Sequence, residues 1–460
     1  MSLIHDIIII GGGIVGLGVF RQLTLNGYKD VLLLDKSSQI LTGASSGNSG
    51  ILHTGFDTIP ETLESKLVKR GYELYQSFAQ DIKLPIKKIG AYIIAWKSDE
   101  LETLKQILDT AHKNGVTDIE EISPTTLYER EPHLRANALN ALYIPGECIV
   151  DPLTLPLILY MQSKLLGGYV QMNTEIINGK YDLEKKYWLL NDGQFKSRIV
   201  INCAGLYGDY IEQIRINQQV SSTSTFTIQP RIGQFSVYSS SISELPIKSI
   251  ILPLPTKFTK GIIIYPNLFN QIIIGPTAET QHDRSQAPIK SDINNILYNK
   301  INELIPTFSK LNYQHIGSYT GIRPATEYSD YQIHSYNDLQ WICCGGIRST
   351  GLSSSLAIGE YICNKLNEMI NIKHEIVCEG YSSERYYQSL EQLKSMFSLT
   401  LNGLQPNLIV NESKVLPTIT GDIKLGDNMK SLNLKIDCAG EIFDISHSLL
   451  KLAWITKRLE

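Results

Sequence analysis

Four residues near the start of the chain have the types and spacing of a dinucleotide-binding motif. Gly11, Gly13 and Gly16 form the pattern G-x-G-x-x-G, and Asp35 follows at the end of the next apolar run. In this motif the first glycine permits a tight turn, the second lets a pyrophosphate approach the backbone, and the third lets a helix pack closely on a strand. The acidic residue lies where a ribose hydroxyl is held. These four residues alone fit NAD and FAD equally well.

The motif needs a strand, a turn, a helix and a second strand in that order, and the sequence supplies each of them. Residues 7–10 are an unbroken run of isoleucine, which is typical of a buried parallel strand. Apolar residues then recur at helical intervals, Gly27 ends the predicted helix, and residues 31–34 form the second strand. The first turn of the helix would direct its unpaired N–H groups at the phosphates.

The composition indicates an ordinary globular protein with more than one domain. The chain has 460 residues, of which 43% are hydrophobic and 19% are charged. A net charge of −4 argues against a general nucleic-acid binder. The seven scattered cysteines contain no C-x-x-C pair, which gives no sign of a metal site and predicts reduced thiols and a cytoplasmic location. No apolar run reaches the roughly 18–20 residues that span a bilayer, so we expect no transmembrane segment.

Side chains suited to proton transfer and to anion binding occur further along the chain. His53 lies in a loop of small residues, 41–57, that could wrap closely around a ligand. Its imidazole can accept a proton at neutral pH, although spacing alone favours a loop histidine that only contacts backbone. Arg323 and Arg348 carry guanidinium groups, which suit phosphate or carboxylate, but each could instead form a structural salt bridge. Lysines such as Lys260 are usually solvated surface charges.

Five segments resemble the D-amino-acid-oxidase-like superfamily of FAD enzymes and, within it, the FAD-linked glycerol-3-phosphate dehydrogenases and oxidases. They are NSGILH at 48–53, IVDP at 149–152, INCAGLY at 201–207, the pieces LPTK, KG and GPTAE within 254–279, and GIRSTGL at 346–352. The L-2-hydroxyglutarate dehydrogenases are a sister family that shares the N-S-G-x-x-H segment. The resemblance spans residues 5–370 of this chain.

The resemblance implies FAD as the cofactor and gives roles to individual residues. His53 would accept the proton of a substrate hydroxyl, and the catalytic cations Arg323, Arg348 and Lys260 would hold a small anionic substrate. Many relatives have glutamate where this chain has an aspartate at the end of the second strand, so a contact to the ribose through water is expected there. The residues expected to contact FAD are Gly11, Gly13, Gly16, Asp35, Lys36, Ser45, Ser46, Asn48, Ser49, Ala204, Gly205, Gly346, Gly351 and Leu352.

The fold predicted on this basis is α/β, with a Rossmann-like FAD-binding domain of the glutathione-reductase type interleaved with an antiparallel-sheet substrate domain. The FAD-binding domain is expected to comprise residues 1–80, 165–215 and 326–380, and the substrate domain residues 81–164 and 216–325. The stretch from Glu131 to Pro152 is predicted to be irregular. Residues 381–460 are expected to begin with a helical segment and to continue as a tail of unknown role.

Three functions are compatible with these observations. The first is FAD-dependent oxidation of sn-glycerol 3-phosphate to dihydroxyacetone phosphate by hydride transfer to flavin N5, which segment 254–279 favours. The second is the same chemistry on L-2-hydroxyglutarate or a similar 2-hydroxy acid, because paired arginines would suit a dicarboxylate equally well. The third is an FAD-bound subunit of a larger complex without independent activity. Oxygen, a quinone and a partner protein are all open as electron acceptors.

Overall fold

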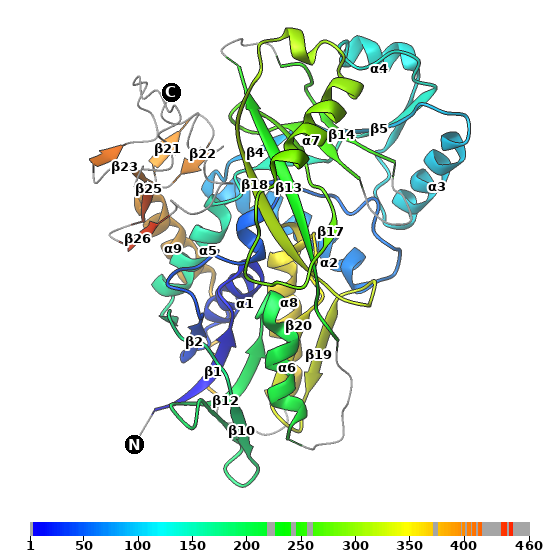
Figure 1. Ribbon diagram of the computed structural model, residues 1–460. Helices are drawn as coiled ribbons and strands as arrows, with labels where there is room; N and C mark the ends of the chain where they lie inside the picture. Colours follow the sequence, from blue (N-terminus) through cyan, green and yellow to red (C-terminus); the bar gives the residue numbers. More distant parts are fainter. Residues whose placement is uncertain are drawn as a thin grey trace.

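The computed structural model describes residues 3–218, 226–240, 245–254, 261–370 and 376–396, together with the backbone of strands between Ser398 and Asp444. Two large sheets organise this part of the chain, a mainly parallel sheet of eight strands and a largely antiparallel sheet of nine (Figure 1). The predicted α/β fold, with a Rossmann-like sheet beside a largely antiparallel one, is confirmed. The division into domains at the residues given above stays a prediction.

The first sheet is built from three separate stretches of the chain. Its parallel part has the order β20–β12–β1–β2–β9, and β10, β11 and β19 are added in antiparallel pairings. The strands are β1 (Ile4–Ile10), β2 (Val31–Leu34), β9 (Tyr169–Gln171), β10 (Gly179–Asp182), β11 (Tyr187–Leu190), β12 (Phe195–Asn202), β19 (Gln332–Tyr336) and β20 (Trp341–Gly345).

Helices on both faces of the first sheet explain the unbroken isoleucine run in β1. Ile7 and Ile9 pack into one apolar core, and Ile8 and Ile10 pack into another on the opposite face. A strand that is buried on both sides shows no alternation of polar and apolar residues. The first core contains α1 (Ile14–Leu25), α2 (Leu63–Ile82), α5 (Thr154–Leu165), α8 (Gly351–Ile370) and α9 (Ser383–Met396), and the second contains α6 (Gly208–Ile216).

The second sheet supplies the opposite wall of the site. Its order is β17–β13–β16–β15–β14–β5–β7–β6, with β18 paired to β13, and only β14 and β5 run parallel among the described pairs. Helices α3 (Glu100–Lys113) on one face, and α4 (Pro124–Arg130) and α7 (Ser291–Leu304) on the other, bury its apolar side chains. The strands are β5 (Ala91–Ala95), β6 (Glu120–Ile122), β7 (Asn140–Ile144), β13 (Gln229–Ser239), β14 (Ile250–Leu252), β15 (Ile263–Pro266), β16 (Ile272–Gly275), β17 (Glu279–Thr280) and β18 (Gln314–Ala325).

Three short strands join the two sheets. They are β3 (Ile51–Leu52), β4 (Ile86–Lys88) and β8 (Cys148–Val150), in the order β3–β8–β4. The prediction of an irregular stretch at 131–152 is therefore wrong, because β7 and β8 both lie in it. The strand β7 has five residues and β8 has three, so neither produces a clear alternating pattern.

The C-terminal part begins with the predicted helical segment, α9, which buries Tyr386, Leu390 and Leu393 in the core of the first sheet. Beyond it the backbone forms a two-stranded and a four-stranded sheet, which lie on the left in Figure 1. Their strands are β21 (Ser398–Thr400), β22 (Gly403–Gln405), β23 (Asn407–Val410), β24 (Ser413–Val415), β25 (Leu434–Cys438) and β26 (Glu441–Asp444).

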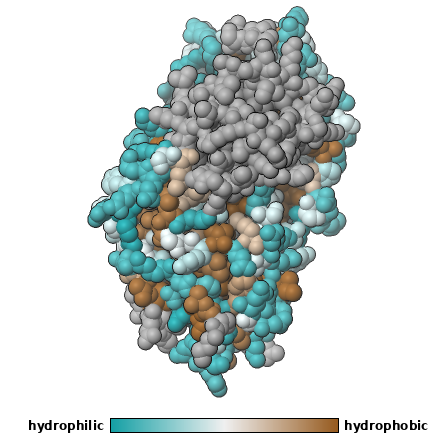
Figure 2. All heavy atoms as spheres, turned by 90° about the vertical axis from the view of Figure 1, so that its left-hand side faces the viewer, coloured by the Kyte–Doolittle hydropathy of each residue, from teal (hydrophilic) through white to brown (hydrophobic). Residues whose placement is uncertain are grey.

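The described surface on this side of the molecule is mixed. Figure 2 shows hydrophobic residues scattered among hydrophilic ones there. Among the residues that the structure describes, no helix is both long and apolar enough to cross a membrane.

Candidate functional site

A large cavity lies between the two sheets and is lined by most of the predicted site residues. Its volume is about 1250 Å³, which exceeds the roughly 300–1,000 Å³ of typical small-ligand pockets. A cavity of this size has room for a dinucleotide cofactor and a small substrate together. The predicted residues that line it are Gly11, Gly13, Asp35, Lys36, Ser45, Asn48, Ser49, His53, Ala204, Gly205, Arg323, Gly346, Arg348, Gly351 and Leu352.

The glycine motif leaves the first turn of α1 open to the cavity. A Cβ atom at Gly11 would lie 2.4 Å from the carbonyl oxygen of Cys203, and one at Gly16 would lie 1.9 Å from that of Gly11. Gly13 precedes the helix and makes no side-chain cap, so α1 presents N–H groups to an anion beside it. Gly16 does not line the cavity, and its contribution is close packing. These features fit the pyrophosphate of FAD.

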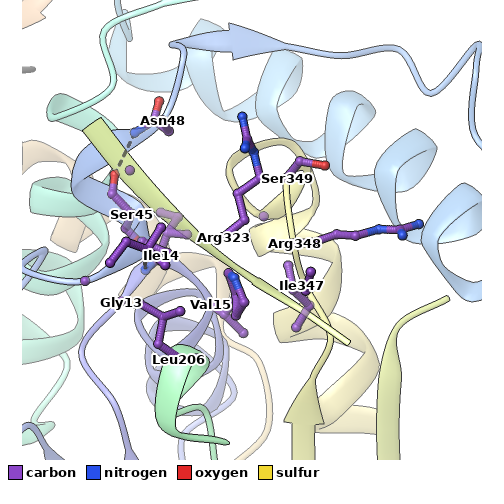
Figure 3. A pocket seen from close by; sticks show the side chains of 18 of the residues that line it. Gly13, Ile14, Val15, Ser45, Asn48, Leu206, Arg323, Ile347, Arg348 and Ser349 are labelled. Atoms are coloured by element: carbon purple, nitrogen blue, oxygen red, sulfur yellow. Dashed lines mark hydrogen bonds between the residues drawn. The ribbon is translucent and has the colours of Figure 1, made fainter. Parts of the chain in front are cut away.

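The loop after β2 closes around this helix start. The hydroxyl of Ser45 accepts a hydrogen bond from the N–H of Ile14 at 2.9 Å, and the amide of Asn48 donates to the carbonyl of Ser45 at 2.7 Å (Figure 3). Ser46 instead donates to the carbonyl of Gly43 and does not line the cavity. These hydrogen bonds tie the loop to the start of α1.

Asp35 and Lys36 lie at the end of β2, where the adenosine part of the cofactor is expected. The Asp35 carboxylate accepts hydrogen bonds from the backbone N–H groups of Gly12 at 2.6 Å and Ser37 at 2.8 Å. Its oxygens retain further lone pairs toward the cavity. The Lys36 ammonium lies 3.2 Å from the centre of the Tyr207 ring. The short Asp35 side chain therefore holds the glycine loop in place through its hydrogen bond from Gly12.

The second sheet holds the same loop from the other side. The Tyr265 hydroxyl donates to the carbonyl of Ser49 at 2.6 Å. At Gly47, an added Cβ would lie 2.4 Å from the Cα atom of Gly321 on β18. This close backbone approach requires glycine in both segments, at Gly47 and at Gly321. The loop at 41–57 and the second sheet are therefore in direct contact.

His53 is fixed by contacts at its backbone and at its ring. Its N–H donates to the Ser353 hydroxyl of α8 at 2.9 Å, and its ring Nδ1 lies 2.8 Å from Glu147 Oε2. The His53 side chain is 22% exposed and lines the cavity, whereas the Glu147 side chain is fully buried. The pair is suited to accept a proton from a ligand in the cavity.

Arg323 and Arg231 place two cations side by side on the opposite wall. They are directly opposite each other in the register of β13 and β18, so both side chains point to the same face, and both line the cavity. Burial and, secondly, the positive charge of Arg231 lower the pKa of Arg323 to about 10. Within the described residues no carboxylate forms an ion pair with Arg323, whose hydrogen bonds run to the Thr277 carbonyl at 3.4 Å. This wall is suited to bind an anion.

Arg348 also lines the cavity but has a carboxylate partner. Its guanidinium donates to the carbonyl of Ser329 at 2.5 Å and lies 3.6 Å from Glu64 Oε2 on α2. Figure 3 shows its side chain directed away from Arg323. The structure therefore brings His53, Arg323 and Arg348 to one cavity without making the two arginines a single clamp. Lys260 lies outside the described residues.

Sequence reasoning missed two residues of the site, Glu147 and Arg231. Glu147 lies in the stretch that was predicted to be irregular, and a single carboxylate next to Gly146 carries no recognisable pattern. Arg231 has no local signal in the sequence, because only the register of β13 against β18 pairs it with Arg323. The adjacent cysteines Cys343 and Cys344 are buried in β20.

The parallel sheet, the glycine turn at α1 and the cavity define a dinucleotide-binding protein. The chain matches the FAD dependent oxidoreductase family, DAO, over residues 6–365. It therefore belongs to this family and is an FAD-dependent oxidoreductase, with FAD as its cofactor.

Individual proteins of known activity are similar over most of their length. Glycerol 3-phosphate dehydrogenase of Caloramator mitchellensis is 29% identical over 79% of this chain and 74% of its own. Mitochondrial L-2-hydroxyglutarate dehydrogenase of Arabidopsis thaliana is 27% identical over 78% and 83%, respectively. The FAD-bound structure of L-alpha-glycerophosphate oxidase from Mycoplasma pneumoniae superposes with a TM-score of 0.72 at 26% identity, covering 81% of this chain and 96% of that one.

Proposed function

We propose that the protein oxidises sn-glycerol 3-phosphate to dihydroxyacetone phosphate. The observation that carries this proposal is the pair Arg231 and Arg323, two cations in register on one wall of the cavity that holds His53. Two positive charges suit a phosphate dianion better than a neutral alcohol or an amino acid. The similarity to a glycerol 3-phosphate dehydrogenase and to an L-alpha-glycerophosphate oxidase supports the same substrate.

In this proposal each side of the cavity has one task. Arg323 and Arg231 hold the phosphate, with Lys260 as a further cation implied by the resemblance. His53 accepts the proton of the C2 hydroxyl, which leaves the electron pair on the oxygen to form the carbonyl. FAD, when bound, supplies the two-electron acceptor that takes the hydride from the same carbon. Arg348 adds positive charge from a position already neutralised in part by Glu64.

The residues that would hold FAD follow the carboxyl ends of the parallel strands β1, β2 and β20 of the first sheet. The N-terminus of α1, with Gly11 and Gly13 before it, would bind the pyrophosphate, and Ser45 and Asn48 would close over it. Gly346, Gly351 and Leu352, which follow β20, line the same cavity, and Gly351 lies close to Ile14 at the start of α1.

The alternative substrate is L-2-hydroxyglutarate or another 2-hydroxy acid, which the similarity to the Arabidopsis thaliana enzyme favours. It has two carboxylates and the same secondary alcohol, so the same arginines and His53 would serve. A substrate panel separates the two, because a phosphate monoester and a dicarboxylate place their charges differently around the alcohol.

The test is anaerobic mixing of the FAD-loaded enzyme with glycerol 3-phosphate. The flavin absorbance is expected to bleach at millimolar substrate, and lactate or glycerol under the same conditions serves as the control. If the flavin stays oxidised with glycerol 3-phosphate and bleaches with 2-hydroxyglutarate, the alternative replaces the proposal.

The electron acceptor and the cytoplasmic location remain predictions. Peroxide formation in air would identify an oxidase, whereas reduction of a quinone analogue without peroxide would identify a dehydrogenase. Turnover of the isolated chain with an artificial dye would argue against a subunit that lacks independent activity.

A further inference from the structure

Glu147 is a fully buried carboxylate that contacts the predicted base, His53. It lies between β7 and β8, and its side chain has no exposed surface. Oε1 accepts hydrogen bonds from the Thr54 N–H at 2.7 Å and the Thr54 hydroxyl at 2.9 Å. Oε2 lies 2.8 Å from His53 Nδ1. Among the described residues, this histidine is its single ion-pair partner. A buried carboxylate needs such partners, since an uncompensated charge is costly.

The backbone makes this contact a feature of the fold. β3 and β8 are antiparallel and pair Ile51 with Ile149 and Leu52 with Cys148. Continuing that register by one residue sets His53 beside Glu147, so the two side chains are cross-strand neighbours. The turn itself is anchored, because the Glu147 carbonyl accepts the Gly90 N–H at 3.0 Å and the Tyr72 hydroxyl donates to the Gly146 carbonyl at 2.7 Å.

The contact also determines which ring nitrogen can accept a proton. A carboxylate can only accept a hydrogen bond, so His53 Nδ1 must carry the proton that lies between them. The lone pair of the neutral ring is then on Nε2. The hydrogen bond from Nδ1 to Glu147 therefore fixes both the tautomer and the orientation of the His53 ring.

The other titratable groups around this turn do not compete for that role. Burial raises the pKa of the Cys148 thiol to about 11, and burial also raises the pKa of Tyr72, so both are neutral near pH 7. Lys88 on β4 is exposed and forms no ion pair with Glu147. From α8, the neighbour of His53 is the Ser353 hydroxyl, which does not titrate in this range.

We propose that Glu147 is the positioning residue for His53. The proposal rests on the proposed function, in which His53 is the base. The O–H bond of the substrate breaks, its electron pair stays on oxygen, and the proton forms a new bond to His53 Nε2. The ring becomes an imidazolium, and the adjacent negative charge of Glu147 stabilises it without taking the proton itself.

The test is the substitution E147Q in the FAD-loaded enzyme. The glutamine keeps the shape but loses the charge, and its single carbonyl oxygen cannot serve both Thr54 and His53. We expect the rate of flavin reduction at saturating glycerol 3-phosphate to fall by about 10²- to 10³-fold. KM is expected to change by less than about threefold because Glu147 does not line the cavity.

The pH dependence separates positioning from a merely structural contact. With the carboxylate gone, an imidazolium is less stable, so the acid limb of the pH–rate profile should move to lower pH in E147Q. E147D, which retains the charge, should recover part of the rate. Y72F, which removes a hydrogen bond from the same turn without altering the carboxylate, should reduce flavin within about threefold of the wild-type rate.

A variant of His53 distinguishes the failure of this proposal from that of the proposed function. If H53Q reduces flavin at the wild-type rate, His53 is not the base and the proposed mechanism fails. If H53Q is slow but E147Q is normal in rate and pH profile, only the role of Glu147 is refuted. If both are slow, adding E147Q to H53Q should cause no further loss.

A measurement on the unsubstituted protein covers the case in which E147Q does not retain FAD. In ¹⁵N-histidine-labelled wild-type enzyme, with H53Q to assign the signal, the neutral His53 ring should carry its proton on Nδ1. A neutral ring protonated on Nε2 would overturn the proposal.

Discussion

Arg348 and Arg323, two of the arginines that line the cavity, occupy opposite electrostatic settings. Arg348 lies 3.6 Å from the Glu64 carboxylate, which is itself held by the Thr350 hydroxyl at 2.7 Å. Arg323 has another arginine, Arg231, as its cross-strand neighbour, and burial together with that charge lowers its pKa to about 10. The charge of Arg348 is compensated by a carboxylate, whereas the charge of Arg323 is repelled by a second arginine.

The difference supports Arg323, rather than Arg348, as the proposed anion-binding cation. A guanidinium beside a carboxylate is largely compensated in the empty protein and gains little from a bound anion. Like charges directly opposite each other on two strands are unfavourable until an anion binds between them. Gly233 leaves room for the Arg323 side chain, because a Cβ atom there would lie 2.7 Å from Arg323 Nη2. The charge of an arginine's neighbour is therefore a better guide to anion binding than the position of that arginine in the cavity.

The largest effect is expected from R323Q. Loss of a charge-assisted, paired contact to phosphate should lower kcat/KM for glycerol 3-phosphate by about 10²- to 10³-fold, which corresponds to about 3–4 kcal/mol. The measurement is anaerobic flavin reduction over a range of substrate concentrations. R70Q, at an exposed arginine on α2 that pairs with Glu360, is the matched control. A loss in R70Q equal to that in R323Q would remove the distinction between the two kinds of arginine.

A ligand test probes the same wall without turnover. Inorganic phosphate should compete with the substrate and should stabilise the wild-type enzyme, by about 2.7 kcal/mol at a concentration of 100 times Kd. The R323Q enzyme should show neither effect. Thermal unfolding at increasing phosphate concentration, with chloride at equal ionic strength as the control, measures this. Equal stabilisation of both enzymes would place the phosphate elsewhere.

A smaller effect is expected from R231Q, and its pH dependence has a defined sign. Arg323 binds an anion only as a cation, so wild-type kcat/KM should fall as pH rises through about 10. Removing Arg231 removes the second cause of the low pKa, after burial, and should move this decline to higher pH. At pH 7 the loss of one contact should reduce kcat/KM by about tenfold. An unchanged alkaline limb would show that the two cations do not interact.

The contrast between the two walls also explains what the sequence predicted and what it did not. The first sheet could be predicted because its signals are local: an isoleucine run, a glycine turn and an acid follow one another within 35 residues. The residues expected to contact FAD are assigned by the resemblance, and these assignments stay predictions. The pairing of β13 with β18 could not be predicted, because 74 residues separate Ser239 from Gln314.

The same limit applies to Glu147 and Glu64. His53 and Glu147 are 94 residues apart in sequence, and Arg348 and Glu64 still further. The sequence shows that a histidine and several arginines are present, but their partners depend on strand register and helix packing. Those partners are what separate a base from a loop histidine and a binding cation from a structural one.

The smallest effect is expected from R348Q. Arg348 is about one-third exposed, so its pair with Glu64 contributes little after solvent screening, about 1 kcal/mol at most. The midpoint of thermal unfolding should fall by about 1–2 °C, and kcat/KM should change by less than about fivefold. Glu64 keeps its hydrogen bond from Thr350 in this variant. In the double variant E64Q/R348Q the effects of the two single substitutions should not add, because each removes the same ion pair. A loss of kcat/KM in R348Q as large as that in R323Q would instead make both arginines one substrate clamp, as the resemblance implied.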